Sequence, residues 1–428
     1  MVTDFPFLEF FAGGGLARIG LGDAWTCVFA NDISAKKAAT YRTNFAPAHE
    51  LFVGDIHAVS QEHIPGEPVL AWASFPCQDL SLAGNGRGLS AARSGTFWPF
   101  WSLMLLLDHQ GRGIPIIVLE NVPGLLVANN GKDFEELLTV LTTAGYRCGT
   151  LVIDAATFVP QSRSRVFIVA IKRSVDIPDG LVLHHHTPRI SEWQPATLTN
   201  AYVRLPRFIQ DSWLWWRLPV PPVRQTQLAD LIEHDVSLHR WNSAAETQRI
   251  LRMMSSAHRQ RVIDAQRDGR QQIGTIYKRI RIEDGERLQR AEVRFDGISG
   301  CLRTPTGGSS RQTIIVVADG DVQTRLLSVR EAARLMGVPE TYTLPENYND
   351  GYHIMGDAVA VPVVSWLEQH LLRRLAHNVT RTVPLLRATD PPVPTRAQFR
   401  ACRPGSSSGC TRGACHARHR GRSHRAAG

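Results

Sequence analysis

A cysteine, a glutamate and two arginines each stand beside a short apolar run in this chain of 428 residues. Cys77 follows the run "VLAWASF" and a proline, and Glu120 follows the run "PIIVL". Arg163 and Arg165 precede the run "VFIVAI". A thiolate is a nucleophile, a carboxylic acid can donate a proton, and guanidinium groups favour the thiolate form of a cysteine or hold a substrate. If the three runs lie together in one sheet, these side chains predict covalent catalysis.

Each of these residues also has a simpler interpretation. A cysteine at the end of a strand is most often a small apolar core residue. A glutamate in the same position is often solvated or caps the next helix. The combination of the three segments favours the catalytic interpretation, because neither simple role explains why they occur together.

The glycine-rich segment "FFAGGGLARIGLG" lies between an apolar run and a helical pattern. Glycines allow a tight turn and a close approach of the backbone to a ligand. Asp32 and Asp55 end the next two apolar runs, and Asp32 stands close to the ~20 residues at which a ribose-binding acid follows such a turn. Ligands of open α/β sheets bind at the carboxyl ends of strands. The pattern predicts a nucleotide-like ligand, although both aspartates could instead be helix N-caps.

Six apolar runs predict the strands that would position these groups. They cover residues 5–11, 25–32, 50–56, 69–75, 115–122 and 165–171. Helical patterns, such as residues 131–146, lie between some of them, and this alternation is typical of a parallel sheet covered on both faces. Residues 97–107 predict a buried helix. We therefore predict an α/β, Rossmann-like domain over residues 1–174.

The pattern changes in residues 175–325, which predict a second, smaller and irregular domain. This segment contains proline-rich pieces, a tryptophan cluster at residues 213–216 and a helical, arginine-rich pattern at residues 244–266. Tryptophans at such spacing more often form a core than a base-stacking surface. We therefore expect the cluster to be buried.

The C-terminal part of the chain predicts two further regions. Residues 326–378 predict helices that return to the first domain, with Ser328 as an N-cap. Residues 379–428 predict a disordered, arginine-rich tail. The formal net charge is +9, and residues 376–428 alone hold ten arginines and one acid. A smaller basic surplus lies in residues 175–325, so the charge fits a polyanionic partner, or simply a solvated surface.

The composition excludes several classes of protein. No apolar run approaches the ~20 residues of a membrane span, and the N-terminal sequence lacks the features of a secretion signal. Seven cysteines in a chain of this length indicate a reducing compartment. The cysteines and histidines of the tail lack the paired spacing of zinc sites, so we expect no metal. Together these features predict a cytoplasmic protein with no membrane partner.

Five segments occur in a fixed order: "FAGGGLARIGL", "FPCQ", "LENVPGL", "VPQSRSRVFIVA" and "GDAVAVPVV". Together they resemble the cytosine-C5 DNA methyltransferase family, over residues 5–174 and 297–370. The resemblance implies transfer of a methyl group from S-adenosylmethionine to C5 of a cytosine flipped out of duplex DNA, through a covalent adduct of Cys77 with C6. It also implies that residues 175–325 recognise the target sequence.

The resemblance implies a role for each site residue. Cys77 is the nucleophile, Glu120 acts as a general acid at N3 of the cytosine, and Arg163 and Arg165 supply positive charge and hold the base. The implied cofactor residues are Phe11, Ala12, Gly13, Gly15, Asp32, Ile33, Asp55, Ile56, Pro76, Asp357 and Ala358. The implied DNA contacts are Gln78, Arg87 and Arg93, in a loop that closes over the flipped base, and Arg303, Thr304, Ser309, Ser310 and Arg311.

Three positions depart from the family's usual pattern. Glu9 stands in place of an aspartate, Leu16 in place of a glycine and Asp357 in place of an asparagine. All three belong to the segments that imply the cofactor pocket. We therefore expect them to alter the affinity for the cofactor.

Three other functions stay open on sequence alone. A tRNA-cytosine methyltransferase would share the fold, and a DNA-binding protein with a degenerate catalytic domain would explain the three departures. A nicotinamide oxidoreductase would explain only the glycine-rich turn. For the DNA methyltransferase, the resemblance implies a bacterial, nucleoid-associated monomer. Its cognate restriction endonuclease would be a functional rather than a physical partner.

Overall fold

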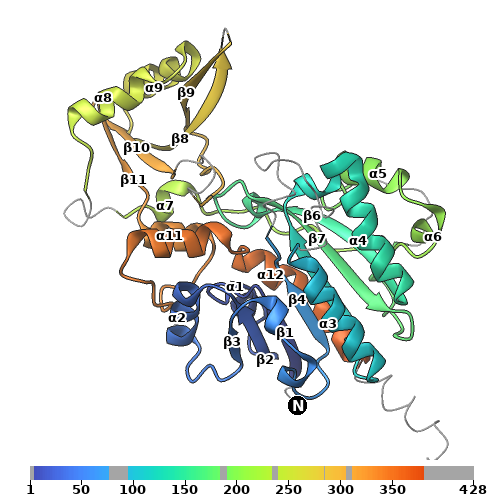
Figure 1. Ribbon diagram of the computed structural model, residues 1–428. Coiled ribbons are helices and arrows are strands. Elements are labelled where there is room, and N and C mark those ends of the chain that lie inside the picture. The colour runs from blue at the N-terminus through green and yellow to red at the C-terminus, as the bar shows by residue number, and fades with distance from the viewer. Residues whose placement is uncertain are drawn as a thin grey trace, which may run out of the picture. The chain divides into compact units, whose positions relative to one another are not determined.

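The computed structural model describes residues 4–76, 95–183, 190–233, 240–283, 285–304 and 311–379. Its larger sheet has seven strands in the order β3-β2-β1-β4-β5-β7-β6 (Figure 1). They are β1 (Phe5–Phe10), β2 (Trp25–Asp32), β3 (Leu51–Val53), β4 (Leu70–Ala73), β5 (Ile116–Asn121), β6 (Tyr146–Asp154) and β7 (Ser164–Lys172). β1 to β5 pair in parallel, whereas β7 is antiparallel to both β5 and β6.

All six runs predicted as strands form strands, but the sequence analysis missed β6 and wrongly made every strand parallel. Residues 155–163 join β6 to β7, and they are too few for the crossover of a dozen or more residues that a parallel pair needs. The helix predicted at residues 131–146 ends earlier, because Gly145 has a φ of 84° and stops it. β6 then begins at once, at Tyr146.

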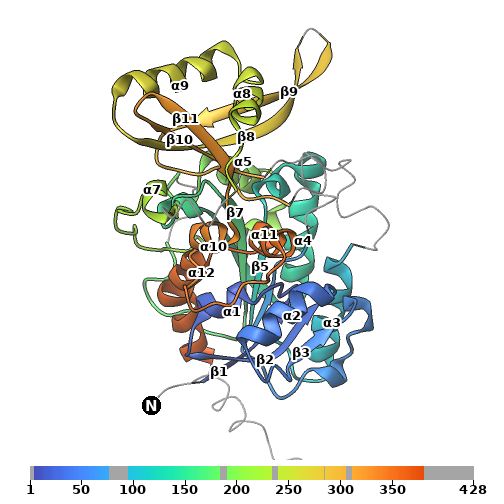
Figure 2. The same ribbon diagram turned by 90° about the vertical axis from the view of Figure 1, so that its left-hand side faces the viewer.

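Alternate residues of each strand point to opposite faces of the large sheet, and each face has its own core. On β1, Phe7 belongs to one core, whereas Leu8 and Phe10 belong to the other. The first face is covered by α1 (Leu16–Leu21), α2 (Ala35–Asn44) and α12 (Val361–Leu367), and the second by α3 (Phe97–His109) and α4 (Lys132–Thr143) (Figure 2). The predicted α/β sheet with two covered faces and the buried helix at residues 97–107 are both confirmed.

The C-terminal helices pack against the start of the chain. α12 lies on α1, where a Cβ added to Gly20 would come within 2.4 Å of Val364. α10 (Val329–Leu335) begins at Ser328, whose hydroxyl accepts from the Glu331 amide at 3.0 Å. The predicted N-cap is therefore confirmed. α11 (Tyr348–Asp357) follows α10 and precedes α12 in the chain. A π-helical turn (Glu368–Leu372) extends α12.

A second sheet of four strands, in the order β11-β10-β8-β9, forms with α8 and α9 what we call the small lobe. Its elements are β8 (Gln272–Glu283), β9 (Glu286–Arg294), β10 (Thr313–Ala318), β11 (Asp321–Leu326), α8 (Ala244–Arg252) and α9 (Ser256–Asp268). Ile250, Val262 and Ile276 share its core. The helical pattern at residues 244–266 is two helices, because Ser255 caps a second helix through the His258 amide. The sequence analysis did not predict this sheet.

The tryptophan cluster of residues 213–216 is buried, as predicted. The Trp216 indole donates to the carbonyl of Val169 on β7 at 3.3 Å, and Trp213 and Trp215 pack against Tyr202. Tyr202 lies on α5 (Ala196–Val203). The other helices of this region are α6 (Arg207–Gln210) and α7 (Leu228–Leu231). Part of the segment after residue 174 therefore packs on the large sheet, and the domain boundaries stay predictions.

Among the described residues, the model contains no helix with the length and apolar character needed to cross a membrane. The predicted tail lies almost entirely outside the described residues, which end at residue 379.

Candidate active site

The antiparallel pairing of β5 with β7 brings Glu120 to Arg165. Nε of Arg165 lies 3.1 Å from Oε1 of Glu120, and the two side chains are only 15% and 8% exposed. Arg165 also donates to the Ser164 carbonyl at 2.8 Å, which fixes a second edge of its guanidinium. Two of the four predicted catalytic residues therefore form a shielded acid and cation pair at the end of β5.

The segment that contains Cys77 starts beside the same strand end. The Asn121 side chain, next to Glu120, donates to the Phe75 carbonyl at 3.2 Å. This hydrogen bond ties the chain two residues before Cys77 to the end of β5. Cys77 itself lies outside the described residues, as do Gln78, Arg87 and Arg93. Their predicted roles stay predictions.

Arg163 has surroundings that the sequence analysis did not foresee. Its side chain is buried and donates to the carbonyls of Leu302 and Gly356, both at 2.9 Å, and to that of Ala358 at 2.5 Å. Burial and the neighbouring Arg165 lower the pKa of its guanidinium. These contacts join the start of β7 to the segment between β9 and β10 and to the end of α11. They favour a role in holding the site together over contact with a substrate.

Cys301 is a residue that the sequence analysis passed over. The Arg163 guanidinium donates to its Sγ at 3.4 Å, and the Arg165 side chain is a second hydrogen-bond partner. Burial raises the pKa of the Cys301 thiol, but Arg163, Arg165 and Arg303 outweigh burial and hold this pKa below its usual value. The only sequence signal was its place directly before Leu302 and Arg303, in a segment already considered for DNA contact.

The glycine-rich turn after β1 forms the second part of the site. Phe11 and Gly13 both have a φ of 58°, and Gly15 has a φ of 78°. Asp32, at the end of β2, accepts the Gly13 amide at 2.8 Å through Oδ2 and the Ser34 amide at 2.8 Å through Oδ1. A Cβ added to Gly13 would meet no atom within 4 Å, so open space lies in front of the turn. Predicted residues from two strands are therefore brought together here, and Asp32 shapes the turn directly.

The other predicted cofactor residues differ in their exposure. Ile33 is 70% exposed although it follows the buried Asp32, whereas Ile56 is buried. Asp55 is exposed and caps a short 3₁₀ turn (Ile56–Ala58), and its hydrogen bond from the His57 amide lowers its pKa. The N-cap interpretation therefore describes Asp55 in this structure. Pro76 is exposed at the last described position before residue 77.

Two of the three departures from the family pattern make specific contacts. Asp357 forms an ion pair with Lys37 of α2 at 2.7 Å, and the Arg163 hydrogen bonds hold the carbonyls on either side of Asp357. Glu9 is buried, accepts the Arg18 amide at 3.3 Å, and its Oε2 has no hydrogen-bond partner among the described residues. Burial raises the pKa of Glu9 to about 8. Leu16 is a buried core residue of α1.

The family model for C-5 cytosine-specific DNA methylases matches residues 5–373 of this chain. The chain belongs to this family. Among the curated relatives, type II methyltransferase M.MspI of Moraxella sp is 25% identical over 371 residues, which cover 86% of this chain and 71% of the relative. Type II methyltransferase M.BsuFI of Bacillus subtilis is 26% identical over 371 residues, which cover 86% of this chain and 73% of the relative.

Solved structures share the fold of this methylase at lower identity. The Entamoeba histolytica methyltransferase EhMeth superposes with a TM-score of 0.55 and 14% identity, covering 88% of this chain and 99% of the neighbour. The S. pombe Dnmt2 methyltransferase gives a TM-score of 0.50 and 17% identity, covering 89% and 99%. The α/β sheet described above is therefore the fold of S-adenosylmethionine-dependent methyltransferases.

Of the DNA contacts predicted for the methylase, Arg303, Thr304 and Arg311 lie within the described residues. A Cβ added to Gly356 of α11 would lie 3.1 Å from the Thr304 amide, so the segment with Arg303 and Thr304 packs closely on the end of that helix. Arg311 lies over the Tyr348 ring, 5.5 Å from its centroid, and its guanidinium donates to Asn349. Ser309 and Ser310 lie outside the described residues.

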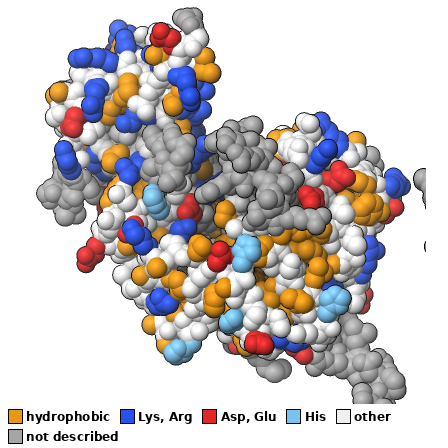
Figure 3. All heavy atoms as spheres, viewed as in Figure 1, with side chains coloured by type: hydrophobic (Ala, Val, Ile, Leu, Met, Phe, Trp, Pro, Cys, Tyr) orange, Lys and Arg blue, Asp and Glu red, His pale blue; other side chains and the backbone are white. Residues whose placement is uncertain are grey.

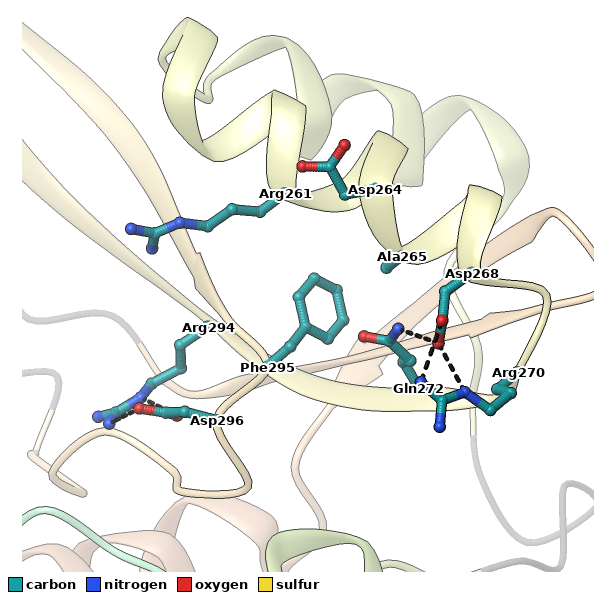
Figure 4. Close-up of a pocket in the computed structure, with 9 residues that line it drawn as sticks. All are labelled: Arg261, Asp264, Ala265, Asp268, Arg270, Gln272, Arg294, Phe295 and Asp296. Atoms are coloured by element: carbon teal, nitrogen blue, oxygen red, sulfur yellow. Dashed lines mark hydrogen bonds and ion pairs between the residues drawn. The ribbon is translucent and has the colours of Figure 1, made fainter.

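The small lobe of the methylase contains a cavity of about 570 Å³, shown in Figure 4. It is lined by Arg261, Asp264, Ala265, Asp268, Arg270, Gln272, Arg294, Phe295 and Asp296. Two acids of the lining pair with two of its arginines: Arg270 contacts Asp268 at 3.0 Å, and Arg294 pairs with Asp296. None of the predicted site residues lines this cavity.

Proposed function

We propose that this methylase transfers a methyl group from S-adenosylmethionine to C5 of a cytosine within a specific sequence of duplex DNA. The observation that carries the proposal is the shielded Glu120 and Arg165 pair, in a chain whose family match spans residues 5–373. Both residues come from the segments "LENVPGL" and "VPQSRSRVFIVA", which the family resemblance already assigned to the cytosine.

The chemistry needs three actions from the chain. C5 of cytosine is a weak nucleophile, and addition of the Cys77 thiolate to C6 makes C5 an enamine carbon. That addition raises the electron density at N3, where Glu120 can share a proton. Arg165, fixed by Glu120 and the Ser164 carbonyl, keeps further N–H groups for the carbonyl oxygen of the base. After methyl transfer the C5 proton leaves and the cysteine is expelled.

The cofactor fits the turn after β1. S-adenosylmethionine supplies the electrophilic methyl group when it is bound. Gly13 leaves open space beside the backbone, and the exposed Ile33 and the partly buried Phe11 offer apolar surface for an adenine ring. Asp32 already accepts two amide protons, so we propose that it orients the turn as well as facing the ribose hydroxyls. Asp357 and Ala358 close the pocket from the end of α11.

We propose that the small lobe contacts the DNA. Arginine and lysine side chains gather over this lobe in Figure 3, and β8 and β9 carry several of them on a paired two-stranded ribbon. A two-stranded ribbon fits the major groove, and arginines there can bind phosphates or guanine edges. Ile280 and Ile282 are 48% and 75% exposed on the same ribbon, which adds apolar surface for thymine methyl groups.

A tritium-transfer assay tests the function. The purified chain, labelled S-adenosylmethionine and mixed-sequence duplex DNA are incubated, and the labelled base is identified after digestion. We expect label at C5 of cytosine, and none with Cys77→Ser. Unmodified tRNA serves as the competing substrate: label in tRNA alone would move the function to RNA. Binding of cofactor and DNA without transfer to either would indicate a degenerate catalytic domain.

Two further proposals concern the partner and the oligomeric state, and the first is suggested by relatives named type II methyltransferases. We propose that a restriction endonuclease of the same specificity accompanies this enzyme in a bacterial cytoplasm, and that the methylase acts as a monomer. Light scattering of the free protein and of the protein with DNA checks the oligomeric state. A dimer in both would overturn the second point.

A further inference from the structure

A thiol lies between the two arginines of the candidate active site. Cys301 Sγ accepts a hydrogen bond from Arg163 at 3.4 Å and contacts the Arg165 side chain as well. Its side chain is partly exposed. Cys27 and Cys148, in contrast, are fully packed in the core, and burial raises the pKa of each to about 12. Among these three thiols, Cys301 alone has cationic hydrogen-bond partners at the site.

The charges around Cys301 explain what it could do there. Arg163 and Arg165 are two residues apart at the start of β7 and repel each other, which is one cause of the lowered pKa of Arg163. Glu120 pairs with Arg165, but the contacts of Arg163 are with neutral carbonyls and with the sulfur. A negative charge on the sulfur would lie between both cations and reduce their repulsion.

We propose that Cys301 is a positioning residue for methyl transfer: as a thiolate it accepts hydrogen bonds from Arg163 and Arg165 and thereby holds the Arg165 guanidinium against Glu120. The proposal rests on the function proposed above, because it is Arg165 that faces the base. Cys301 does not itself touch the reacting atoms. Its effect is to leave Arg165 fewer orientations before the cytosine arrives.

The sulfur has a second state. Leu302 O lies 3.4 Å from Sγ, and it is the acceptor for the thiol proton when Cys301 is protonated. The same carbonyl accepts from Arg163 at 2.9 Å. Protonation therefore turns the sulfur from an acceptor for two arginines into a donor to a carbonyl. Loss of the thiolate should loosen Arg165 without unfolding the site.

Other charged groups also face this thiol and influence its titration. Arg303 comes from its own segment and Tyr352 from α11, whereas Glu120 of β5 and Asp357 of α11 act on its partner Arg163. Arg163, which donates to the sulfur, and Arg165 lower the pKa of Cys301 more than Arg303 does. A change at Arg165 should therefore move the Cys301 titration more than a change at Arg303.

The first test is a thiol titration of the full chain. Iodoacetamide pulses at a series of pH values are followed by trypsin digestion and mass spectrometry of the peptide with Cys301 as its only cysteine, which is residues 295–303, or 295–311 in Arg303→Gln. We expect a midpoint below the ~8.5 of a free thiol. Arg165→Gln should raise it, Arg303→Gln should raise it less, and the distant Arg207→Gln should leave it unchanged. Cys27 and Cys148 should stay unmodified while the protein is folded.

The second test is the pH dependence of kcat for wild type and Cys301→Ser. Ionisation of Cys77 affects both proteins and cancels in the ratio of their kcat values. At low pH the ratio should approach one, because neither side chain is charged. The kcat of wild type divided by that of Cys301→Ser should rise to about tenfold as the thiol ionises. A misplaced catalytic group costs about this factor or more. The KM for S-adenosylmethionine should stay within about twofold.

A ratio that does not change with pH, or a Cys301 titration that ignores Arg165→Gln, would overturn the proposal. Cys301→Ala should lose more activity than the serine variant. If the alanine variant fails to fold, the wild-type titration and the serine variant still decide the question. If no methyl transfer occurs at all, the proposed function fails, but the titration still shows whether the thiolate and Arg165 are in contact.

Discussion

The end of β5 and the ribbon of β8 and β9 hold their charged side chains in opposite ways. At β5 the ion pair of Glu120 with Arg165 is nearly buried, and the neighbouring Arg163 is held by main-chain carbonyls. On the ribbon Arg279 and Arg281 share Glu292, and both arginines are more than 40% exposed.

The difference teaches which charges are fixed before the substrate binds. Backbone partners and burial leave a guanidinium few orientations, as catalysis requires. Exposed pairs exchange easily with water and with phosphates, because their net free energy is small. The first arrangement suits a reaction at one atom, and the second suits a surface that must follow a DNA backbone. Four substitutions test this contrast.

The largest effect is expected at Glu120. Glu120→Gln keeps the shape of the side chain but removes the proton that N3 would share and the ion pair with Arg165. We expect kcat to fall by about 10²-fold or more, with little change in the KM for S-adenosylmethionine. Steady-state kinetics with labelled cofactor measure both values. Unchanged kcat would show that the pair is structural, as Arg163 is.

Arg163 should act on stability before it acts on chemistry. Arg163→Met leaves the carbonyls of Leu302, Gly356 and Ala358 without their donor. Each unpaired buried acceptor costs about 1–3 kcal/mol, so the free energy of unfolding should fall by about 3 kcal/mol or more. Denaturant unfolding checks this, with Arg207→Gln as the exposed control. A variant as stable as wild type would mean that water replaces the guanidinium.

Only part of the candidate active site could be predicted from the sequence. Glu120 and Arg165 could be predicted because strand ends and a family motif point to them, and the sheet confirms that they meet. Cys301 could not, because its partners lie more than a hundred residues away and only the tertiary fold brings it to β7.

Two errors in the predicted fold have local causes instead. β6 was missed because its first residues continue a helical pattern, and only the glycine at residue 145 marks the break. The small lobe was read as irregular because β8 mixes charged and apolar residues at its exposed end, where alternation no longer reports a buried face. At Asp55 a local interpretation is the correct description. The sequence allowed either a cofactor contact or an N-cap, and in the structure Asp55 is an N-cap.

Glu9 tests a buried carboxyl group that forms no ion pair within the described part of the chain. Its pKa is raised to about 8, from 4.5, so the folded protein binds a proton that the unfolded chain releases between these values. The stability from this group is complete below about pH 4.5 and is lost as pH rises toward 8, by at most about 1.4 kcal/mol per pH unit. Glu9→Gln should not show this loss, so its stability relative to wild type should increase across that range. Unfolding at pH 5, 6.5 and 8 measures the difference. If the free energies of unfolding of the two proteins change with pH in parallel, Glu9 is hydrated rather than buried.

The smallest effect on the fold, and the clearest sign of an adaptable surface, is expected on the ribbon. Arg281→Gln removes one of two cations from Glu292, which keeps Arg279, so the free energy of unfolding should change by less than about 0.5 kcal/mol.

DNA binding of Arg281→Gln should weaken instead. A lost phosphate contact lowers affinity for all sequences and reduces the slope of log K against log salt by about one, whereas a lost guanine contact costs about 1–3 kcal/mol at one base pair. Fluorescence anisotropy at several salt concentrations, with target and scrambled duplexes, separates these outcomes. Arg207→Gln removes an exposed arginine from α6 and should leave the salt slopes for both duplexes unchanged. If Arg281→Gln behaves like that control, the ribbon does not touch the DNA, and the exposed pairs of the small lobe serve only its solubility.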